Sequence, residues 1–354
     1  MAILQADAFP ASQCEEKTGL LELKMCCGLD ERMLIHAARA RGLIRDKTNP
    51  SYDREPGTKE RAGLIAWKEL KHTRYISEGA YCSVHGAQLE GKLVAVKLLK
   101  DEHACNEFAI GSMELETELL RKMSNNHVLK MIGHGHYQLR PFIVTERMQW
   151  SLRDQLKSPP SVFSPCTKLA HLSWSMALDY AKQLAKAMVY IHHEAFPGHH
   201  LLHRDLKPEN IGIAHGGRLV LLDFGLSKLI PASPNEDFCP VHMTGKTGTA
   251  LYMAPEVALS MPYNTKCDVH SYSMVLYELV SRRKPFGIGM DRETLITEVF
   301  ILGARPPLSR KWPAALRLLL KDCWHEQAKC RPDFLTVLNR VESLCAACNL
   351  QVAA

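Results

Sequence analysis

The pattern of apolar and polar positions predicts a β-rich part of the chain followed by a larger helical part. From Leu64, short runs of β-type residues alternate with glycines, which is typical of consecutive antiparallel strands joined by turns. Apolar residues with helical spacing over 107–123 predict one helix within this part. The predicted strands cover residues 75–76, 83–85, 93–98, 128–132 and 142–145.

Beyond about residue 173, helical spacing of the apolar residues dominates. A small β part followed by a run of helices favours an α+β fold. The predicted helices cover residues 174–193, 266–281, 295–302, 314–324 and 334–345.

The first 63 residues differ from the rest. Residues 18–45 indicate one or two short helices, for which Asp30 is a candidate cap, and 46–63 indicate a polar linker. The helical stretch is too short to bury a core of its own. This extension therefore either packs on the main domain or is a flexible tail.

The composition is that of an ordinary globular chain. The 354 residues are 46% hydrophobic and 23% charged, which excludes a disordered or collagen-like protein. The net charge of +6 is spread along the chain, so we predict no nucleic-acid partner. No apolar stretch approaches the roughly 18 residues of a membrane span, and the amino terminus lacks the basic start of a secretory signal. We therefore expect a cytoplasmic protein with no membrane partner, whose 12 dispersed cysteines are reduced thiols.

The strongest chemical signal lies in residues 202–210, which read LHRDLKPEN. A carboxylate (Asp205), an ammonium (Lys207) and an amide (Asn210) stand there at short offsets, and a second carboxylate, Asp223, follows in the triplet DFG. Further motifs occur in a fixed order around them: VAVK at 94–97, APE at 254–256 and RP at 331–332. In this combination the chain resembles the eukaryotic protein-kinase family over roughly residues 64–344.

The resemblance implies a bilobal α+β protein-kinase fold. A small antiparallel β lobe with one main helix would precede a larger, mainly α-helical lobe, with ATP and Mg²⁺ bound in the cleft. The predicted organisation is an extension at 1–63, the small lobe at 64–148, the large lobe at 149–348 and a tail at 349–354.

The resemblance also implies roles for the motif residues in phosphoryl transfer. Asp205 would accept the proton of the substrate hydroxyl and orient its oxygen. Lys207 would neutralise charge on the transferred group. Asn210 and Asp223 would bind magnesium, which prefers oxygen ligands.

The phosphate side of the site combines a lysine with a degenerate loop. Lys97 would hold the α- and β-phosphates beside a carboxylate, and of the glutamates at 114, 116 and 118, Glu116 stands where the family has its own. The family pattern G-x-G-x-x-G-x-V falls on 77–84 (SEGAYCSV), where only the middle glycine remains. Because glycines let backbone N–H groups approach phosphates, we expect weakened nucleotide binding. The loop residues assigned to the nucleotide are Ser77, Gly79, Cys82 and Val84.

Cys82 is either a tolerated small residue, which we favour, or a redox-sensitive thiol above the phosphates.

The adenine end follows from the same resemblance. Thr145 stands at the gatekeeper position, and backbone groups of Glu146 and Met148 would meet the base beneath a roof formed by Val84 and Ala95. The family usually has a bulky apolar residue on the floor, but this chain has a glycine at 212. Either Ile211, Ile213 or a neighbour fills that space, or the pocket is roomier than usual. The residues that match the family's regulatory spine are Leu120, Met131, His203 and Phe224.

Details of the motifs resemble serine/threonine kinases of the tyrosine-kinase-like group, which act on protein substrates. Thr244 or Thr247 would be modified by an upstream activating kinase. Asp268 would hold the catalytic-loop backbone, and Glu256 would pair with Arg331 inside the large lobe.

Three alternatives stand beside this interpretation. One is a pseudokinase scaffold that binds partners without catalysis; such scaffolds tend to lose the motif carboxylates and lysine that this chain retains. Another is a small-molecule kinase, which the complete APE segment disfavours. The last is a zinc site among the four histidines at 192–200, a stretch where exposed polar residues are common.

Overall fold

The computed structural model describes residues 63–157, 172–232, 241, 243, 248–287 and 290–353. All of them belong to one compact unit that begins at Pro56. The predicted extension at 1–63, apart from Gly63, and the two threonines predicted to be phosphorylated lie outside the described residues.

A five-stranded antiparallel sheet forms the small lobe, with the strand order β1-β2-β3-β5-β4. One face of the sheet carries its own buried cluster, which includes Val96, Phe142 and Val144. The other face packs on α3 (Glu107–Lys122), whose first turn is capped by Asn106, because the Asn106 Oδ1 accepts the Ala109 N–H at 3.1 Å. The strands are β1 (Lys71–Glu78), β2 (Cys82–Leu89), β3 (Lys92–Leu99), β4 (Met131–Tyr137) and β5 (Arg140–Glu146).

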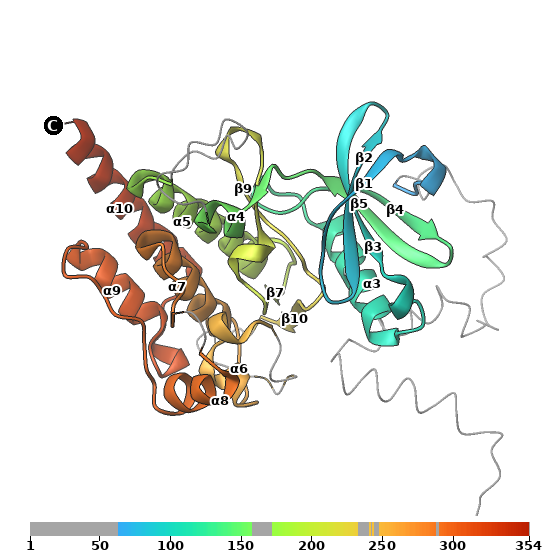
Figure 1. Ribbon diagram of the computed structural model, residues 1–354. Coiled ribbons are helices and arrows are strands. Elements are labelled where there is room, and N and C mark those ends of the chain that lie inside the picture. Colours follow the sequence, from blue (N-terminus) through green and yellow to red (C-terminus); the bar gives the residue numbers. More distant parts are fainter. Residues whose placement is uncertain are drawn as a thin grey trace, which may run out of the picture. The chain divides into compact units, whose positions relative to one another are not determined.

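Helices build the large lobe around α7, in which every residue from Cys267 to Val280 is buried. Figure 1 shows α3 beside the sheet and the large-lobe helices grouped apart from it. The longer elements there are α4 (Leu152–Lys157), α5 (Trp174–Val189), α6 (Pro255–Ala258), α7 (Lys266–Ser281), the π-helix η8 (Leu295–Ile301), α9 (Ala314–Cys323) and α10 (Phe334–Ala353). This arrangement confirms the predicted bilobal α+β fold.

Short strands under the cleft carry the motif loops. The first set is β6 (Trp150–Ser151), β8 (Ile211–Ile213) and β9 (Leu219–Leu221), and the second is β7 (His199–Leu202) paired with β10 (Lys228–Pro231). The residues 203–210 therefore leave β7 and enter β8, and Asp223 follows β9.

One predicted boundary was wrong because a long-range contact decides the local structure. The strand predicted at 128–132 begins only at Met131, since the backbone of 127–129 pairs with β9: the Leu129 N–H donates to the Leu221 carbonyl at 3.0 Å, and the Leu221 N–H donates to the His127 carbonyl at 2.8 Å. The predicted tail at 349–354 is helical as far as Ala353, because α10 continues. The helix predicted at 174–193 is α-helical to Val189 and becomes a π-helical turn, Tyr190–Glu194.

Candidate active site

A buried carboxylate fixes the backbone at the start of residues 203–210, the predicted catalytic loop. Asp268, at the start of α7, accepts the His203 N–H at 2.8 Å and the Arg204 N–H at 2.9 Å, as the sequence predicted. It also lies 2.9 Å from the His192 Nε2. Burial would raise the pKa of Asp268, but His192 and the other donors lower it. The loop needs such support because Arg204 has a left-handed backbone, with φ of 70°.

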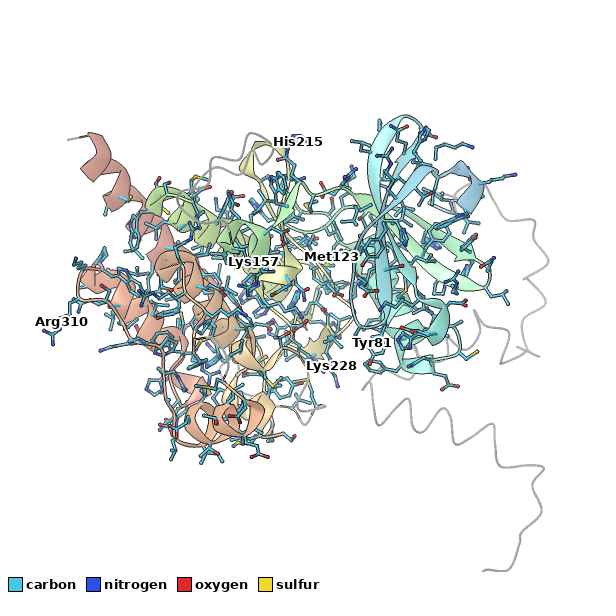
Figure 2. The ribbon with its side chains drawn as sticks, viewed as in Figure 1. Tyr81, Met123, Lys157, His215, Lys228 and Arg310 are labelled. Carbon is cyan, nitrogen blue, oxygen red and sulfur yellow. The ribbon has the colours of Figure 1, made fainter. Side chains whose placement is uncertain are left out.

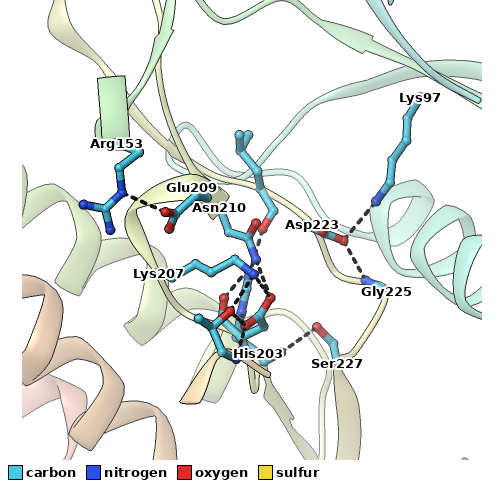
Figure 3. A network of polar contacts seen from close by, with 12 residues as sticks. Lys97, Arg153, His203, Lys207, Glu209, Asn210, Asp223, Gly225 and Ser227 are labelled. Carbon is cyan, nitrogen blue, oxygen red and sulfur yellow. Dashed lines mark hydrogen bonds and ion pairs between the residues drawn. The ribbon is translucent and has the colours of Figure 1, made fainter. Parts of the chain in front are cut away.

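Asp205 lies in the loop that Asp268 holds, and three residues contact its carboxylate. Lys207 Nζ lies 2.6 Å from Oδ2 and Asn210 Nδ2 lies 2.9 Å from it, while the Thr249 N–H donates to Oδ1 at 2.8 Å. The structure thus brings both predicted catalytic residues together with one predicted metal ligand (Figure 3).

Thr249 also holds the two predicted catalytic residues through its side chain, since its hydroxyl donates to Asp205 at 3.0 Å and accepts from Lys207 at 2.8 Å. The preceding Gly248 makes this close approach possible. A Cβ atom there would lie 2.4 Å from the Arg204 carbonyl oxygen, and φ is +99°.

Lys97 joins the two lobes electrostatically. Its Nζ lies 2.6 Å from Glu116 Oε2 and 2.9 Å from Asp223 Oδ1. Of the three candidate glutamates at 114, 116 and 118, the one expected from the sequence therefore faces the lysine. Burial would lower the pKa of Lys97, but the two carboxylates raise it above its usual range. Burial would raise the pKa of Asp223, yet Lys97 holds it down at about 2, so both groups are charged at neutral pH.

The DFG segment is seated against α3. The Ser112 hydroxyl donates to the Gly225 carbonyl at 2.6 Å, and a Cβ at Gly225 would lie 2.5 Å from the Ser112 Oγ. Asp223 itself has a φ of 60°. Glycine at 225 thus allows α3 to approach closely enough for Glu116 to reach Lys97.

The oxygen atoms on this side of the cleft fit a magnesium ion. Asn210 uses its Nδ2 on Asp205, and Asp223 uses Oδ1 on Lys97 and the Gly225 N–H; no hydrogen bond from another described residue reaches Asn210 Oδ1 or Asp223 Oδ2. The Leu222 N–H donates to the Asn210 carbonyl at 2.9 Å, which ties the two ligand-bearing segments together. Magnesium is commonly held by one or two protein oxygens plus substrate phosphates and water.

Residues 77–84, the predicted phosphate loop, form a tight turn between β1 and β2. The Gly79 N–H donates to the Cys82 carbonyl at 2.8 Å, Ser77 pairs with Val84, and Val84 stands opposite Lys97. Burial raises the pKa of the Cys82 thiol to about 11. Because the thiolate is the reactive form, this disfavours a redox-sensitive Cys82 and favours a tolerated small residue.

Contacts outside the loop motif hold this turn in place. The Lys100 N–H donates to the Tyr81 carbonyl at 2.9 Å, and Lys100 Nζ lies 3.2 Å from the Glu78 carboxylate. The Tyr81 ring packs edge-on against His103, in the 3-10 turn Asp101–His103, and against Phe108 in the first turn of α3, with centroid distances of 5.1 and 5.8 Å. Figure 2 labels Tyr81 near α3. Nothing in the sequence pattern pointed to this aromatic cluster, because His103 and Phe108, the partners of Tyr81, are not part of any motif.

The predicted hinge segment, residues 145–148, has one carboxylate, and contacts with Arg218 and Lys130 engage it. Glu146 pairs with Arg218 and accepts the Lys130 N–H at 3.1 Å, and all three residues line a cavity of about 990 Å³ on that side of the hinge. Because its side chain makes these contacts, Glu146 would meet a base only through its backbone groups. Thr145 stands opposite Ala95 in the β3–β5 pair.

The floor position beneath the predicted base site is occupied by a side chain from the hinge. A Cβ at Gly212 would lie 2.4 Å from Met148 Cγ, 2.8 Å from Met148 Sδ and 3.2 Å from Leu222 Cδ1. Met148 thus occupies the space over Gly212, which favours a neighbour that fills the space over a roomier pocket.

Other large-lobe predictions can be compared directly. Arg331 forms a two-pronged ion pair with Glu256, at 2.6 and 2.9 Å, as expected. Of the four clustered histidines, His192 is buried against Asp268, and the His200 Nδ1 lies 2.6 Å from the His192 carbonyl. Within the described ranges, no group of three or more His, Cys, Asp or Glu side chains is arranged to hold a metal ion.

A buried arginine network escaped the sequence reasoning. Arg153 of α4 contacts Glu278 and the Tyr252 hydroxyl, and its Nε lies 2.7 Å from the Glu209 carboxylate. Tyr252 also donates to Glu278 at 2.7 Å. This network fixes the turn Ala250–Tyr252 directly after Thr249, but Arg153 carries no local signal that separates it from a surface arginine.

None of the described helices is long and apolar enough to cross a bilayer.

Comparison with known proteins agrees with this geometry. A family model described as protein tyrosine and serine/threonine kinase matches residues 70–341, well over half of the chain. In Arabidopsis thaliana, serine/threonine-protein kinase 12 is 31% identical over 280 residues, which cover 78% of this chain and 56% of that relative. Serine/threonine-protein kinase VIK is 29% identical over 279 residues (78% and 60%), and integrin-linked protein kinase 1 is 30% identical over 286 residues (80% and 57%).

The chain spans less than two thirds of the length of each of these relatives. The match to the family model nevertheless includes both lobes and every motif described above, from the phosphate loop to Arg331. This chain is therefore a member of the protein tyrosine and serine/threonine kinase family.

Proposed function

We propose that this chain is an active protein kinase that transfers the γ-phosphate of MgATP to serine or threonine hydroxyls of protein substrates. The observation that carries the proposal is the state of Asp205, whose carboxylate is held by Lys207, Asn210 and Thr249 inside a loop fixed by Asp268. A carboxylate held this way is oriented before the substrate arrives.

The roles follow from the contacts. Asp205 would accept the proton of the substrate hydroxyl while that oxygen attacks the γ-phosphorus, and the bond to the β-phosphate oxygen breaks with its electron pair leaving on ADP. Lys207 would stabilise the charge on the moving phosphoryl group, and Lys97 would orient the α- and β-phosphates. Magnesium, when bound at Asn210 and Asp223, would supply charge neutralisation between the phosphates.

Substrate class, group and activation are proposed on the resemblance. The LHRDLKPEN loop and the named serine/threonine-kinase relatives support serine and threonine as acceptors, and the motif details support the tyrosine-kinase-like group. An upstream kinase acting on Thr244 or Thr247 stays a prediction.

A pseudokinase scaffold is the second candidate, and the glycine-poor phosphate loop is the feature that favours it. The decisive test uses radiolabelled ATP with a generic protein substrate and compares the wild type with Asp205→Asn. We expect a loss of about 10²–10⁴-fold in transfer for Asp205→Asn with MgADP binding retained. Asp322→Asn, a surface carboxylate, is the matched control. Equally poor labelling by wild type and Asp205→Asn, with both binding nucleotide, would favour the scaffold.

A further inference from the structure

Gly212 lies in a strand whose neighbours point the other way. Ile211 and Ile213 are 0% and 3% exposed and belong to the large core cluster. Because side chains alternate along a strand, the open side of Gly212 faces away from that core. It faces Met148 and Leu222.

Met148 takes up the volume that a larger residue at 212 would need. A Cβ at that position would lie 2.4 Å from Met148 Cγ, closer than real Cβ contacts come, and the second short distance, 2.8 Å, is to Met148 Sδ. Glycine at 212 and methionine at 148 are therefore sterically coupled. The pairing of β6 with β8 places Ser151 opposite Gly212, so the hinge chain is held over this strand.

Met148 and Leu222 lie next to residues that are predicted to bind the nucleotide. Met148 follows β5 through Thr145, whose partner across the sheet is Ala95 of the predicted roof. Leu222 directly precedes Asp223, which contacts Lys97. Met148 is only partly buried, in contrast to the isoleucines on either side of Gly212. Its thioether thus lies between the predicted base site and the strand beneath it.

We infer that the Met148 side chain, seated over Gly212, forms the apolar floor that contacts the purine base. A methionine has an unbranched, rotatable side chain with a polarizable sulfur that packs well on aromatic rings, so it can replace a rigid aliphatic residue as a floor. The inference rests on the proposed nucleotide site but not on phosphoryl transfer.

The test is a reciprocal exchange measured by nucleotide binding. The variants are Met148→Ala, Gly212→Leu and the double variant, and the probe is a fluorescent N-methylanthraniloyl-ADP with Mg²⁺. We expect each single change to weaken ADP binding about tenfold, the first by removing the floor and the second by forcing the Met148 side chain into the base site. The double variant should bind within about threefold of the wild type, because the leucine fills the space that the methionine leaves.

Base contact is separated from a general structural effect by competition. Inorganic tripolyphosphate carries no base, so its dissociation constant, obtained by displacement of the probe, should be the same for Met148→Ala and the wild type. The dissociation constant of unlabelled ADP, obtained in the same way, should rise for Met148→Ala. Met261→Ala, an exposed methionine, and Gly111→Ala, where a Cβ meets nothing within 4 Å, are the matched controls and should bind as the wild type does.

Two results would overturn the inference. Wild-type affinity in Met148→Ala, or strictly additive losses in the double variant, would show that the methionine is not the floor, and phosphoryl transfer by the same protein would leave the proposed function standing. A wild type that binds no ADP at all would remove both the floor and the nucleotide site.

Discussion

The two sides of the cleft are held in place by different means. On the large-lobe side, His203, Asp205 and Asn210 are buried, and each makes hydrogen bonds within the folded chain. On the small-lobe side, every residue of β1 is exposed, and the phosphate loop keeps one of three family glycines. The chemistry of the first side is thus fixed by its own motif residues, whereas the second depends on contacts from outside its motif.

This difference explains why substitutions of motif residues are tolerated on the small-lobe side but not on the large-lobe side. A substitution at a buried, fully bonded position leaves a donor or charge without a partner, which costs several kcal/mol. Residues 77–81 of the phosphate loop are exposed, whereas Cys82 is buried, so a glycine in the exposed part can be replaced at lower cost provided that other contacts, such as those of Tyr81 and Lys100, keep the turn in place.

The largest effect is expected for Asp268→Ala, which tests the hydrogen bonds on the large-lobe side of the cleft. Asp268→Ala would leave the His203 and Arg204 N–H groups and buried His192 without their shared acceptor. We expect a loss of about 3–5 kcal/mol in the free energy of unfolding, measured by urea denaturation. The control is Asp322→Ala, which removes an exposed pair with Arg340 and should cost less than about 1 kcal/mol. Equal effects of the two changes would contradict the comparison.

A smaller effect is expected in the pH dependence of the free energy of unfolding, and it again differs between the two sides of the cleft. His270 is buried in α7, and burial together with Arg331 and Arg305 lowers its pKa well below 6.5. Below pH 6.5 the unfolded chain therefore binds a proton at this position that the folded chain does not, so the folded state loses stability as the pH falls. The slope for this one group is about 1.4 kcal/mol per pH unit.

His270→Phe should remove that share of the slope between pH 6.5 and pH 5, as followed by urea denaturation at each pH. The partly exposed His85, whose pKa is also lowered by burial, provides the matched change on the small-lobe side, and His85→Phe should alter the slope less. If the slope is unchanged in His270→Phe, this histidine is protonated in the folded protein too.

A contact between two residues could be predicted from the sequence only when both residues belong to recognisable motifs. Glu116, Asp268 and Arg331 were paired correctly because their positions are defined by offsets from recognisable strings. The coupling of Met148 with Gly212 and the Arg153 network could not be found this way, since they join segments whose separation in space no local pattern encodes. For the same reason the run at 128–132 resembled a strand although its first residues bond to β9.

The smallest effect tests whether outside contacts really hold the phosphate loop. Phe108→Ala removes the ring that packs on Tyr81, a contact worth about 1 kcal/mol, so affinity for the fluorescent ADP should fall about fivefold while kcat at saturating ATP is unchanged. Leu335→Ala, a helical apolar residue of similar exposure in the large lobe, should change neither quantity.

The aromatic contact also predicts how two changes combine. Tyr81→Phe keeps the ring and should bind ADP as the wild type does, whereas Tyr81→Ala, which also removes the contact with His103, should weaken ADP binding at least as much as Phe108→Ala. Because Tyr81→Ala already removes the contact with Phe108, the double variant should bind ADP no more weakly than Tyr81→Ala alone. Additive losses would mean that the two rings stabilise the phosphate loop separately and not through their mutual contact.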